Sequence, residues 1–503
     1  MNCKLLFRTI RYLKLKQIVY QIKNRISKEN YVQLESSPHA LPNLSAKPIA
    51  RFRSLKGKEF TFLNLSHNFT DWNFIDNGTL FSYKQNYFDF INDDIIGSEE
   101  ACRWIDRFIV EIPNITWGID SYPIALRSIN WIKFFSTHPE FITKRRDDSI
   151  WSQLILLQKK LEFHLLGNHL LEDSFALYIG GNYFQDKNLI EKGYSLLVEQ
   201  LEEQTLLDGG HYEQSPMYHL ILLDRLLDCI NIRPTIELKK YAEKQLGWLE
   251  SIRYSDGTFP MFNDSALSIA PSVSDVFDYA KRLNIEWKQI PLADSGYRRL
   301  ENKDFEITID VGDIKASYQP GHSHADTFNY ELRVHGAPFV VDTGVSTYDK
   351  TSILQYERSS IAHNVVVINN EDSSEVWGGF RVGRRAKVTL LEDLKDRVVA
   401  THDGYSKYGE VKRVFEIKEQ EFVIEDFVRT KMEVVSYIHF APNVIVDIVN
   451  GNLMTNILNI NIAGANKIEI VENTISKEYN KFEPIKVAKI YFNSNLKLTF
   501  VKI

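Results

Sequence analysis

Cysteine is scarce in this chain of 503 residues. The three cysteines, Cys3, Cys102 and Cys229, lie far apart, are odd in number and include no Cys-x-x-Cys spacing. Such a set argues against a disulfide framework and fits a reducing compartment. The chain also lacks any apolar run long enough for a transmembrane helix, so we expect no membrane span.

An excess of positive charge is missing as well. With 60 Lys and Arg against 66 Asp and Glu, the formal net charge is −6, so the protein offers no overall basic field to nucleic acid. Any attraction for an acidic partner must therefore come from a local cleft. A hydrophobic content of 44% with 12% aromatic residues excludes global disorder, and the length allows two or three domains.

The N-terminal segment, residues 1–30, has no uninterrupted apolar core and no small-residue cleavage site, so we recognise no secretory signal peptide. It predicts instead a basic helix with an apolar stripe. The stripe is Leu6, Ile10, Leu13 and Ile18, set among Lys4, Arg8, Arg11, Lys14 and Lys16. Two interpretations stay open: peripheral contact with an anionic membrane surface, and an ordinary docking helix with a solvated basic face. The first places the protein in the cytoplasm or at the inner face of the membrane.

Apolar residues recur with two different periods along the chain. From about residue 85 to 285 the spacing of three and four residues is helical, as in WSQLILLQKKLEFHLL and MYHLILLDRLLDCI. After about residue 300 it changes to period two, in FEITIDVG, IKASYQP, FNYELRVHG, APFVVDTG, HNVVVIN, KRVFEIK, EFVIEDFV and KIEIV. We therefore predict an α+β multidomain protein: a lead-in segment over 1–84, an all-α (α/α) toroid over 85–290 and an antiparallel β-sandwich over 300–503.

Groups that titrate or bind metal near neutral pH are densest in residues 321–344. On an extended strand His322 and His324 share a face, because side chains alternate with period two. Asp342 ends an apolar run further on, and His363 opens another expected strand. Two imidazoles and a carboxylate from neighbouring strands are the ligands of a zinc-type site. We favour such a site over the alternative, hydrogen-bonded histidines in a sandwich core.

Tyr218 lies at an expected helix start. In QSPMYHLILLDRLL, Ser215 has the character of an N-cap and Pro216 that of a first helical residue, which places Tyr218 in the first turn. The helix dipole there favours a phenolate by about 0.3–1 kcal/mol, less than one pKa unit. A tyrosine that exchanges protons near neutral pH therefore needs a neighbouring cation or imidazole as well.

Several sequence blocks in a fixed order carry a resemblance to a known family. They are SYPIALRSINWIKFF, GNHLLEDSFAL, DGGHYEQSPMYH, DGTFPMFNDS, GHSHADTFNYEL, VVDTG and RSSIAHNVVVI. With its helical half followed by a sandwich half, the chain resembles the heparinase II/III-like polysaccharide lyases. The resemblance implies cleavage of a uronic-acid-containing acidic polysaccharide by β-elimination, with no organic cofactor. The basic N-terminal segment resembles members associated with bacterial capsule or exopolysaccharide assembly, which implies a surface polymer made by the cell itself.

The same resemblance assigns roles to single residues. It makes Tyr218 the catalytic tyrosine, Asn168 the amide that neutralises the substrate carboxylate, and His322 the group that stabilises that carboxylate or transfers protons. The positions that some members use for one structural Zn²⁺, a brace beneath the cleft, are His324, Asp342 and His363. The expected sugar contacts are Tyr122, Arg127, His211, Glu213 and Arg358. Interdomain salt bridges are the alternative for this last group.

Two other functions stay open. A glycoside hydrolase on a similar toroid needs two opposed carboxylates flanking the scissile bond. The candidates are Glu172, Asp173, Glu213 and Asp264. A non-catalytic polysaccharide-binding or assembly protein is the third hypothesis, because fold and motif do not establish activity by themselves. The joint presence of the three residues assigned to catalysis argues against it.

Overall fold

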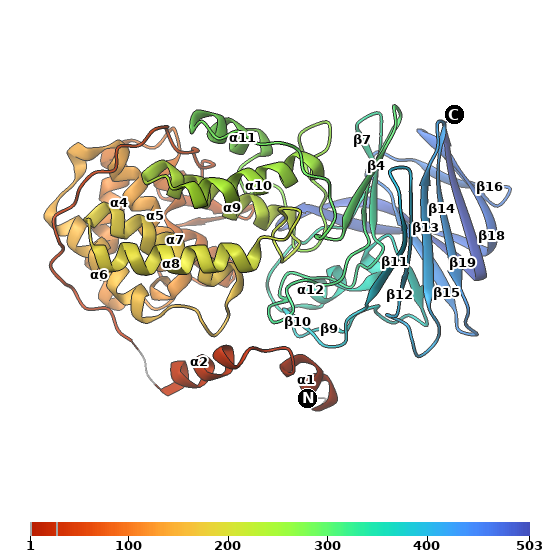
Figure 1. The fold of residues 1–503 in the computed structure, drawn as a ribbon, viewed down its shortest axis with the longest axis horizontal. Coiled ribbons are helices and arrows are strands. Elements are labelled where there is room, and N and C mark those ends of the chain that lie inside the picture. Colours follow the sequence, from red (N-terminus) through yellow and green to blue (C-terminus); the bar gives the residue numbers. More distant parts are fainter. Residues whose placement is uncertain (1–2, 27–28, 503) are drawn as a thin grey trace.

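The computed structural model describes residues 3–26 and 29–502, which form an N-terminal arm and lead-in segment, a helical domain and a β-sandwich (Figure 1). The arm consists of two short helices, α1 (Cys3–Ile10) and α2 (Leu15–Ile26), where the sequence predicted one. An extended segment then leads to a small antiparallel sheet that the sequence analysis did not predict. Its strands are β1 (Leu55–Lys56), β2 (Glu59–Phe62) and β3 (Leu65–Asn68). Phe60 of β2 packs edge-on against Trp104, so the lead-in segment is part of the helical core.

Successive helices build the next domain. They are α3 (Thr79–Tyr87), α4 (Ser98–Glu111), α5 (Ser121–Thr137), α6 (Lys144–Lys159), α7 (Gly167–Phe184), α8 (Lys187–Gln204), α9 (Pro216–Ile232), α10 (Ile236–Ile252) and α11 (Val273–Arg282). α5, α7 and α9 are buried over almost their whole length, because their sequences are apolar on most sides. α4 and α11 each bury an apolar face and expose a polar face. The fully buried helices therefore form the inside of the domain.

Two antiparallel sheets form the sandwich. The first contains β4 (Tyr297–Glu301), β5 (Phe305–Asp310), β6 (Tyr330–Val334) and β7 (Ala337–Val340) in chain order. The strands of the second are β8 (Val366–Ile368), β11 (Val388–Asp393), β12 (Arg397–His402), β13 (Val411–Ile417), β14 (Glu421–Val428), β15 (Val434–His439), β16 (Val446–Val449), β17 (Asn452–Thr455), β18 (Leu458–Glu478) and β19 (Lys481–Lys502). They run in the order β11-β12-β13-β14-β19-β18-β17-β16, while β15 pairs with both β19 and β8. One apolar core joins the two sheets, so the predicted fold class, a helical half followed by an antiparallel sandwich, is confirmed.

The connection between β7 and β11 contains a short helix, α12 (Ser352–Glu357), and a small hairpin of β9 (Val376–Trp377) and β10 (Arg381–Val382). The short 3₁₀ segments of the chain are Asp89–Asn92, Ile112–Asn114, Trp117–Ile119, Pro139–Phe141 and Ser360–Ala362. The last of these ends at His363, so a turn and not a long strand positions this histidine.

The segment between β5 and β6, residues 311–329, is a loop, where the sequence predicted a strand over IKASYQP and an extended conformation around two histidines. Its main chain bonds side chains of the helical domain instead of a neighbouring strand. Lys315 N donates to Gln214 Oε1 at 2.9 Å, and His324 N donates to Asn263 Oδ1 at 3.0 Å. The prediction was wrong because an alternating pattern does not show whether a segment bonds across a domain boundary.

β18 and β19 form a hairpin far longer than the KIEIV strand that the sequence predicted (Figure 1). Its tip reaches the helical domain. Leu267 N donates to Lys477 O at 2.7 Å, and Asn64 Nδ2 donates to Tyr479 O at 2.9 Å. The hairpin therefore places side chains from near the C-terminus at the junction of the two domains.

No helix in the described residues is both long enough and apolar enough to cross a lipid bilayer. Cys102 and Cys229 are buried free thiols, so neither belongs to a disulfide framework.

Candidate active site

A cavity of about 1000 Å³ opens between the lead-in segment, the helical domain and the tip of the β18–β19 hairpin. We call it the cleft. α3, α7 and α9 each contribute residues to its lining, as do the loops around Leu267 and Tyr348. Tyr122, Asn168 and Tyr218 from the predicted site also line it. Its volume is that of a site for a sizeable ligand.

Tyr218 lies in the first turn of α9, as predicted. The hydroxyl of Ser215, the N-cap, accepts a hydrogen bond from Tyr218 N at 3.2 Å, and Pro216 is the first helical residue. The Tyr218 ring stacks on His322 with 3.9 Å between ring centroids, and its hydroxyl is 3.2 Å from the hydroxyl of Tyr348. The helix start thus presents a phenol beside an imidazole at the wall of the cleft.

His322 lies between two buried carboxylates. Its Nδ1 is 2.8 Å from Asp264 Oδ2, and its Nε2 is 3.2 Å from Glu213 Oε2. The other oxygen of Asp264 is 2.8 Å from His324 Nε2, so one carboxylate holds both histidines of the GHSHAD block. Burial alone raises the pKa of Asp264, but the hydrogen bonds from His322 and His324 outweigh it and keep that pKa below its usual range. Asp264 is therefore an ionised anchor for both rings.

Asn168 begins α7 beside the same cluster. Its main-chain N–H donates to Glu213 Oε1 at 2.9 Å, so Glu213 connects Asn168 to His322. The Oδ1 atom of Asn168 is buried and has no hydrogen-bond partner among the described residues. The side chain lies at the cleft, where its amide can donate hydrogen bonds to a ligand carboxylate.

The surroundings of Tyr218 favour the neutral phenol. Burial raises the pKa of Tyr218, the charges of Asp264 and Glu213 act in the same direction, and the hydrogen bond with Tyr348 lowers it only in part. A tyrosine that acts as both base and acid near neutral pH needs a lowered pKa. The stacked imidazole does not supply that lowering, because desolvation is the larger effect. In the protein alone Tyr218 is therefore a proton donor.

The five expected sugar contacts occupy different environments. Tyr122 lines the cleft and packs against His169 at a centroid distance of 4.8 Å. Glu213 lies behind the cleft surface and belongs to the cluster just described. Arg127 is fully buried, and its Nη1 donates to the carbonyl oxygens of Asn86 and Gly118, both at 2.9 Å. Arg127 thus holds the helical core together and does not line the cleft.

His211 and Arg358 are also buried away from the cleft lining. His211 Nε2 is 2.9 Å from Gln204 Oε1, within the turn that precedes α9. Arg358 Nη2 donates to Ser323 O at 2.6 Å, and its carbonyl accepts from Ala325 N at 2.9 Å. Neither residue forms an ion pair with a described residue. Their hydrogen bonds stabilise neighbouring loops, in place of the sugar contact or the salt bridge that we expected.

Two family models match consecutive parts of the chain. "Heparinase II/III N-terminus" matches residues 148–289, and "Heparinase II/III-like, C-terminal" matches residues 285–496. Together they cover more than half of the chain. The chain belongs to the heparinase II/III-like family.

Curated proteins with the name heparin-sulfate lyase are similar over part of their length. The protein from Pedobacter heparinus is 26% identical over 295 residues and that from Bacteroides thetaiotaomicron 22% over 315 residues. Each comparison covers 52% of this chain and 44% of the relative, so the chain spans less than half the length of these relatives. A solved heparinase III has the same fold, with a TM-score of 0.62 at 15% identity over 86% of this chain and 81% of that chain.

Sequence reasoning missed two tyrosines of the cleft. Tyr348 shares a hydrogen bond with Tyr218, and the ring of Tyr479 packs edge-on against Tyr348 at a centroid distance of 5.4 Å. Tyr348 follows closely after the VVDTG block, which was an available signal. Tyr479 lies far along the chain from every family block, and only the long hairpin brings it to the cleft.

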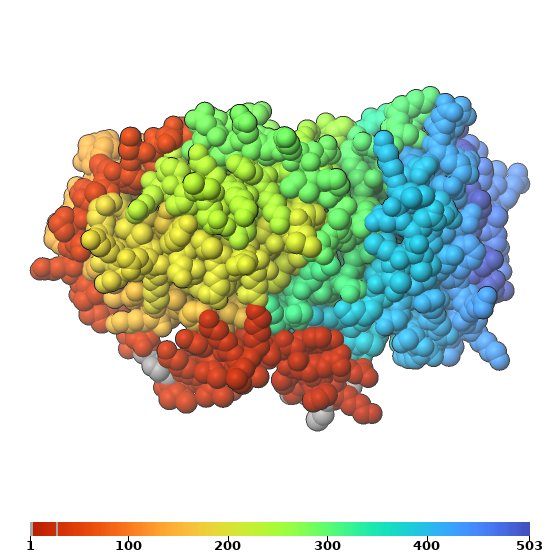
Figure 2. All heavy atoms as spheres, viewed as in Figure 1, coloured from red at the N-terminus to blue at the C-terminus, as the bar shows by residue number. Residues whose placement is uncertain are grey.

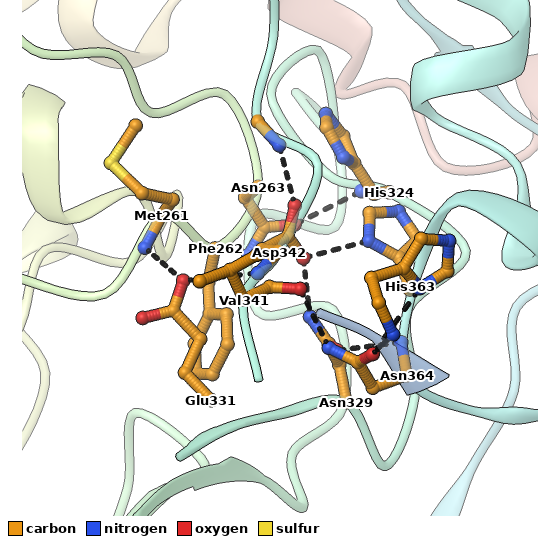
Figure 3. A network of polar contacts seen from close by, with 12 residues as sticks. Met261, Phe262, Asn263, His324, Asn329, Glu331, Val341, Asp342, His363 and Asn364 are labelled. Atoms are coloured by element: carbon orange, nitrogen blue, oxygen red, sulfur yellow. Dashed lines mark hydrogen bonds and ion pairs between the residues drawn. The ribbon is translucent and has the colours of Figure 1, made fainter. Parts of the chain in front are cut away.

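Asp342 lies in a buried polar network below the cluster (Figure 3). Its Oδ2 accepts hydrogen bonds from His363 Nδ1, at 2.8 Å, and from Asn329 Nδ2, while its Oδ1 accepts from Gly344 N at 2.9 Å. The rings of His324 and His363 lie 5.3 Å apart. The three residues expected at the zinc site are therefore neighbours, held by hydrogen bonds.

These three residues fit a metal ion only in part. His324 Nδ1 and His363 Nε2 are buried without a partner among the described residues, and a carboxylate orients each ring through its other nitrogen, as is typical of metal-binding histidines. Asp342 does not fit, because both of its oxygens are engaged. No group of three or more described His, Cys, Asp or Glu residues is arranged to hold a metal ion. We therefore derive no chemical step through a metal.

Proposed function

We propose that this protein is a polysaccharide lyase that cleaves a uronic-acid-containing polymer by β-elimination. One observation carries the proposal: Asn168 and Tyr218, which line the cleft, form one cluster with His322, which stacks on Tyr218, although the three residues are distant in sequence. Glu213 connects the first to the third through its two oxygens, and the rings of the other two are stacked. An amide, a phenol and an imidazole in one cluster are the groups that this elimination needs.

The difficulty of the reaction lies in the proton on C5 of the uronate, which is only weakly acidic. Its removal becomes possible when hydrogen-bond donors stabilise the negative charge that develops on the adjacent carboxylate. The side-chain amide of Asn168 is the first donor we assign to this carboxylate. His322 becomes the second when the substrate carboxylate replaces Glu213 at Nε2, the longer of its two carboxylate contacts at 3.2 Å. Glu213 and Asp264 hold these two groups in place before the substrate arrives.

Tyr218 transfers the protons in this proposal. Because burial raises its pKa, the phenol begins the cycle protonated and donates to the departing glycosidic oxygen as the C4–O bond breaks. The electron pair of the C5–H bond forms the C4–C5 double bond. The proton from C5 restores the phenol, so Tyr218 ends the cycle as it began and no water is consumed.

The substrate we propose is an acidic polysaccharide, and more specifically a bacterial capsule or exopolysaccharide. The curated relatives are heparin-sulfate lyases by name, which supports a polyanionic substrate. Arg53 and Lys350 line the cleft, are exposed, and form no ion pair with any described residue. They supply local positive charge for carboxylates or other anionic groups of a polymer.

Glycoside hydrolysis is supported less well by the geometry. The four acidic residues that a hydrolase could have used are at most 1% exposed, and none of them lines the cleft. Two of them, Glu213 and Asp264, are engaged by the histidine cluster. These residues therefore do not provide two opposed carboxylates with room for a sugar between them.

A screen of purified protein against a panel of uronate polymers tests the proposal. The panel contains heparan sulfate, chondroitin sulfate, alginate and acidic bacterial capsules. We expect ultraviolet-absorbing unsaturated uronate ends, with products lighter by one water than those of hydrolysis in mass spectrometry. Saturated new ends indicate a hydrolase, and binding of a polymer without any cleavage indicates a non-catalytic protein; either result overturns the proposal.

A further inference from the structure

Helix α2 of the N-terminal arm packs against the protein mainly with its polar side, although Tyr20 also contacts Phe163, with 4.8 Å between ring centroids. Gln17, its one buried residue, donates from Nε2 to Leu165 O at 3.0 Å, and Asn24 Nδ2 is 3.1 Å from His164 Nδ1. Gln17 and Asn24 are seven residues apart and lie on the same side of the helix. An amphipathic helix that docks on its own protein normally buries its apolar side, so this orientation is inverted.

The apolar side of α2 faces outward. Leu15, Val19, Ile22 and Ile26 follow one another at helical spacing along one stripe, and their exposed fractions are 76%, 50%, 54% and 82%. Phe7 of α1 is also exposed, at 71%. Figure 2 shows the arm as a ridge along one edge of the molecule. A ridge of large aliphatic side chains in water indicates a surface that another apolar medium covers.

Cations flank this stripe. Lys16 and Lys23 lie on one side of it and Arg25 on the other, all exposed. Residues 1–28 contain eight Lys or Arg and no Asp or Glu. Part of this charge is used within the protein, where Lys14 pairs with Glu203 and Arg8 pairs with Glu375. These two ion pairs fix the arm on both domains. Of the cations beside the stripe, Lys16 lies over the Phe163 ring at 3.9 Å and Lys23 over the Tyr20 ring at 5.2 Å, but all three are exposed and none forms an ion pair with a described residue.

From this arrangement we propose that the arm binds an anionic lipid surface, with the stripe in the acyl boundary and the flanking cations at the headgroups. An apolar stripe with Lys and Arg at its edges is the pattern of helices that lie in a membrane interface. A second copy of the chain is a poor occupant, because pairing two stripes brings two strongly basic segments together. Contact through the arm also holds the cleft near the lipid, since Gln17 bonds Leu165, a residue of the cleft lining.

Vesicle sedimentation of the full chain tests this proposal, with phosphatidylcholine vesicles that contain or lack phosphatidylserine. The apolar variant is Leu15→Asn/Ile22→Asn/Ile26→Asn, and the matched control is Ile236→Asn, which alters an isolated aliphatic residue with 89% exposure on α10. We expect binding to anionic vesicles only, weakened by salt, and reduced about ten-fold or more in the apolar variant but not in the control. Circular dichroism and the melting temperature show whether both variants keep the wild-type fold.

Three outcomes overturn the proposal. The first is no sedimentation of the wild type with anionic vesicles at low salt. The second is binding that the apolar variant retains in full, which assigns the attraction to charge elsewhere. The third is a dimer in light scattering that the apolar variant abolishes while vesicle binding is absent, which makes a second copy the occupant. Lyase activity is not needed for any of these measurements, so they stand apart from the proposed function.

Discussion

Asp264 shows how one buried carboxylate organises the candidate active site. Each of its oxygens contacts a different imidazole. These contacts orient His322 toward Tyr218 and His324 toward His363. Burying a carboxylate is costly unless it is paired and hydrogen-bonded. The two histidines meet that requirement, so His322, to which we assign a catalytic role, and His324 are both held by the same carboxylate.

Replacing Asp264 by Asn tests this dependence through pH. Because the folded pKa of Asp264 lies below the unfolded value, its charge stabilises the fold above about pH 4, and this contribution is lost as the pH falls through the folded pKa. We expect Asp264→Asn to lower the free energy of unfolding by about 3 kcal/mol at pH 7, and the difference from wild type to shrink below about pH 4. Urea unfolding across this pH range measures it. Asp278→Asn, at an exposed carboxylate of α11, serves as control, and a difference that does not vary with pH contradicts the account.

Tyr218→Phe removes only the phenolic oxygen. We expect it to reduce kcat about 10²-fold or more while the fold and polymer binding remain, because the proposed acid is lost and the ring still stacks on His322. Initial rates of ultraviolet absorbance give kcat. Tyr348→Phe is the matched control, since it removes the hydroxyl that meets Tyr218 and should cost much less. Turnover of Tyr218→Phe within a few-fold of wild type shows that another group is the acid.

Among the elements, the β18–β19 hairpin contributes to the cleft from the greatest distance in sequence. A strand pair of this length carries its tip from the sandwich to the helical domain, where Tyr479 packs on Tyr348 and lines the cleft. The tip is also bonded to the lead-in segment through Asn64. The hairpin thereby contacts the lead-in segment, the helical domain and the loop of Tyr348, which all line the cleft.

Truncation at the hairpin tip should affect both stability and substrate binding. We expect Tyr479→Ala to cost about 3 kcal/mol of stability, because a buried ring is removed, and to raise KM more than it lowers kcat. Phe482→Ala, at a half-exposed ring on the same hairpin, is the control and should change neither parameter much. An unchanged KM in a folded Tyr479→Ala protein places the substrate elsewhere.

The polar network below the cluster carries the prediction about zinc. The sequence-based prediction of one zinc ion per chain requires the unpartnered nitrogens of His324 and His363 together with an oxygen that Asp342 frees from its hydrogen bonds, and His363→Ala should then lose the metal. Elemental analysis of protein purified without chelator measures the content. His402→Ala, at another buried histidine, is the control. Absence of metal together with unchanged melting of His324→Ala leaves an ordinary polar core cluster.

For the whole molecule, the net charge of −6 repels a polyanion at long range, so attraction must be local to the cleft. We expect KM for an acidic polymer to rise as the salt concentration is raised from about 50 to about 300 mM, because salt screens exposed charges. Arg53→Gln/Lys350→Gln should raise KM at low salt and flatten its salt dependence. Arg381→Gln, outside the cleft lining, is the control. Equal salt slopes for wild type and the double variant show that other cations attract the polymer.

The sequence by itself determined the features that depend on local pattern. The change from helical to alternating periodicity predicted two halves of different architecture, because burial repeats along each element with the period of its backbone. Ser215, Pro216 and Tyr218 predicted a helix start correctly, since capping involves only neighbouring residues. The ordered blocks also identified the family, and with it Asn168 and Tyr218, which line the cleft.

Only the tertiary structure decided which of these groups touch one another and which face water. Asp264 reaches two histidines some sixty positions away, Tyr479 reaches the cleft on a hairpin, and Arg127 and Arg358 turn inward to carbonyl oxygens. In the arm, the stripe predicted from Leu6 to Ile18 gave way to one that turns outward from Leu15 to Ile26. The reason is physical. Periodicity shows that a helix or strand has an apolar face and a polar face, whereas the segments that pack against each face come from distant parts of the chain.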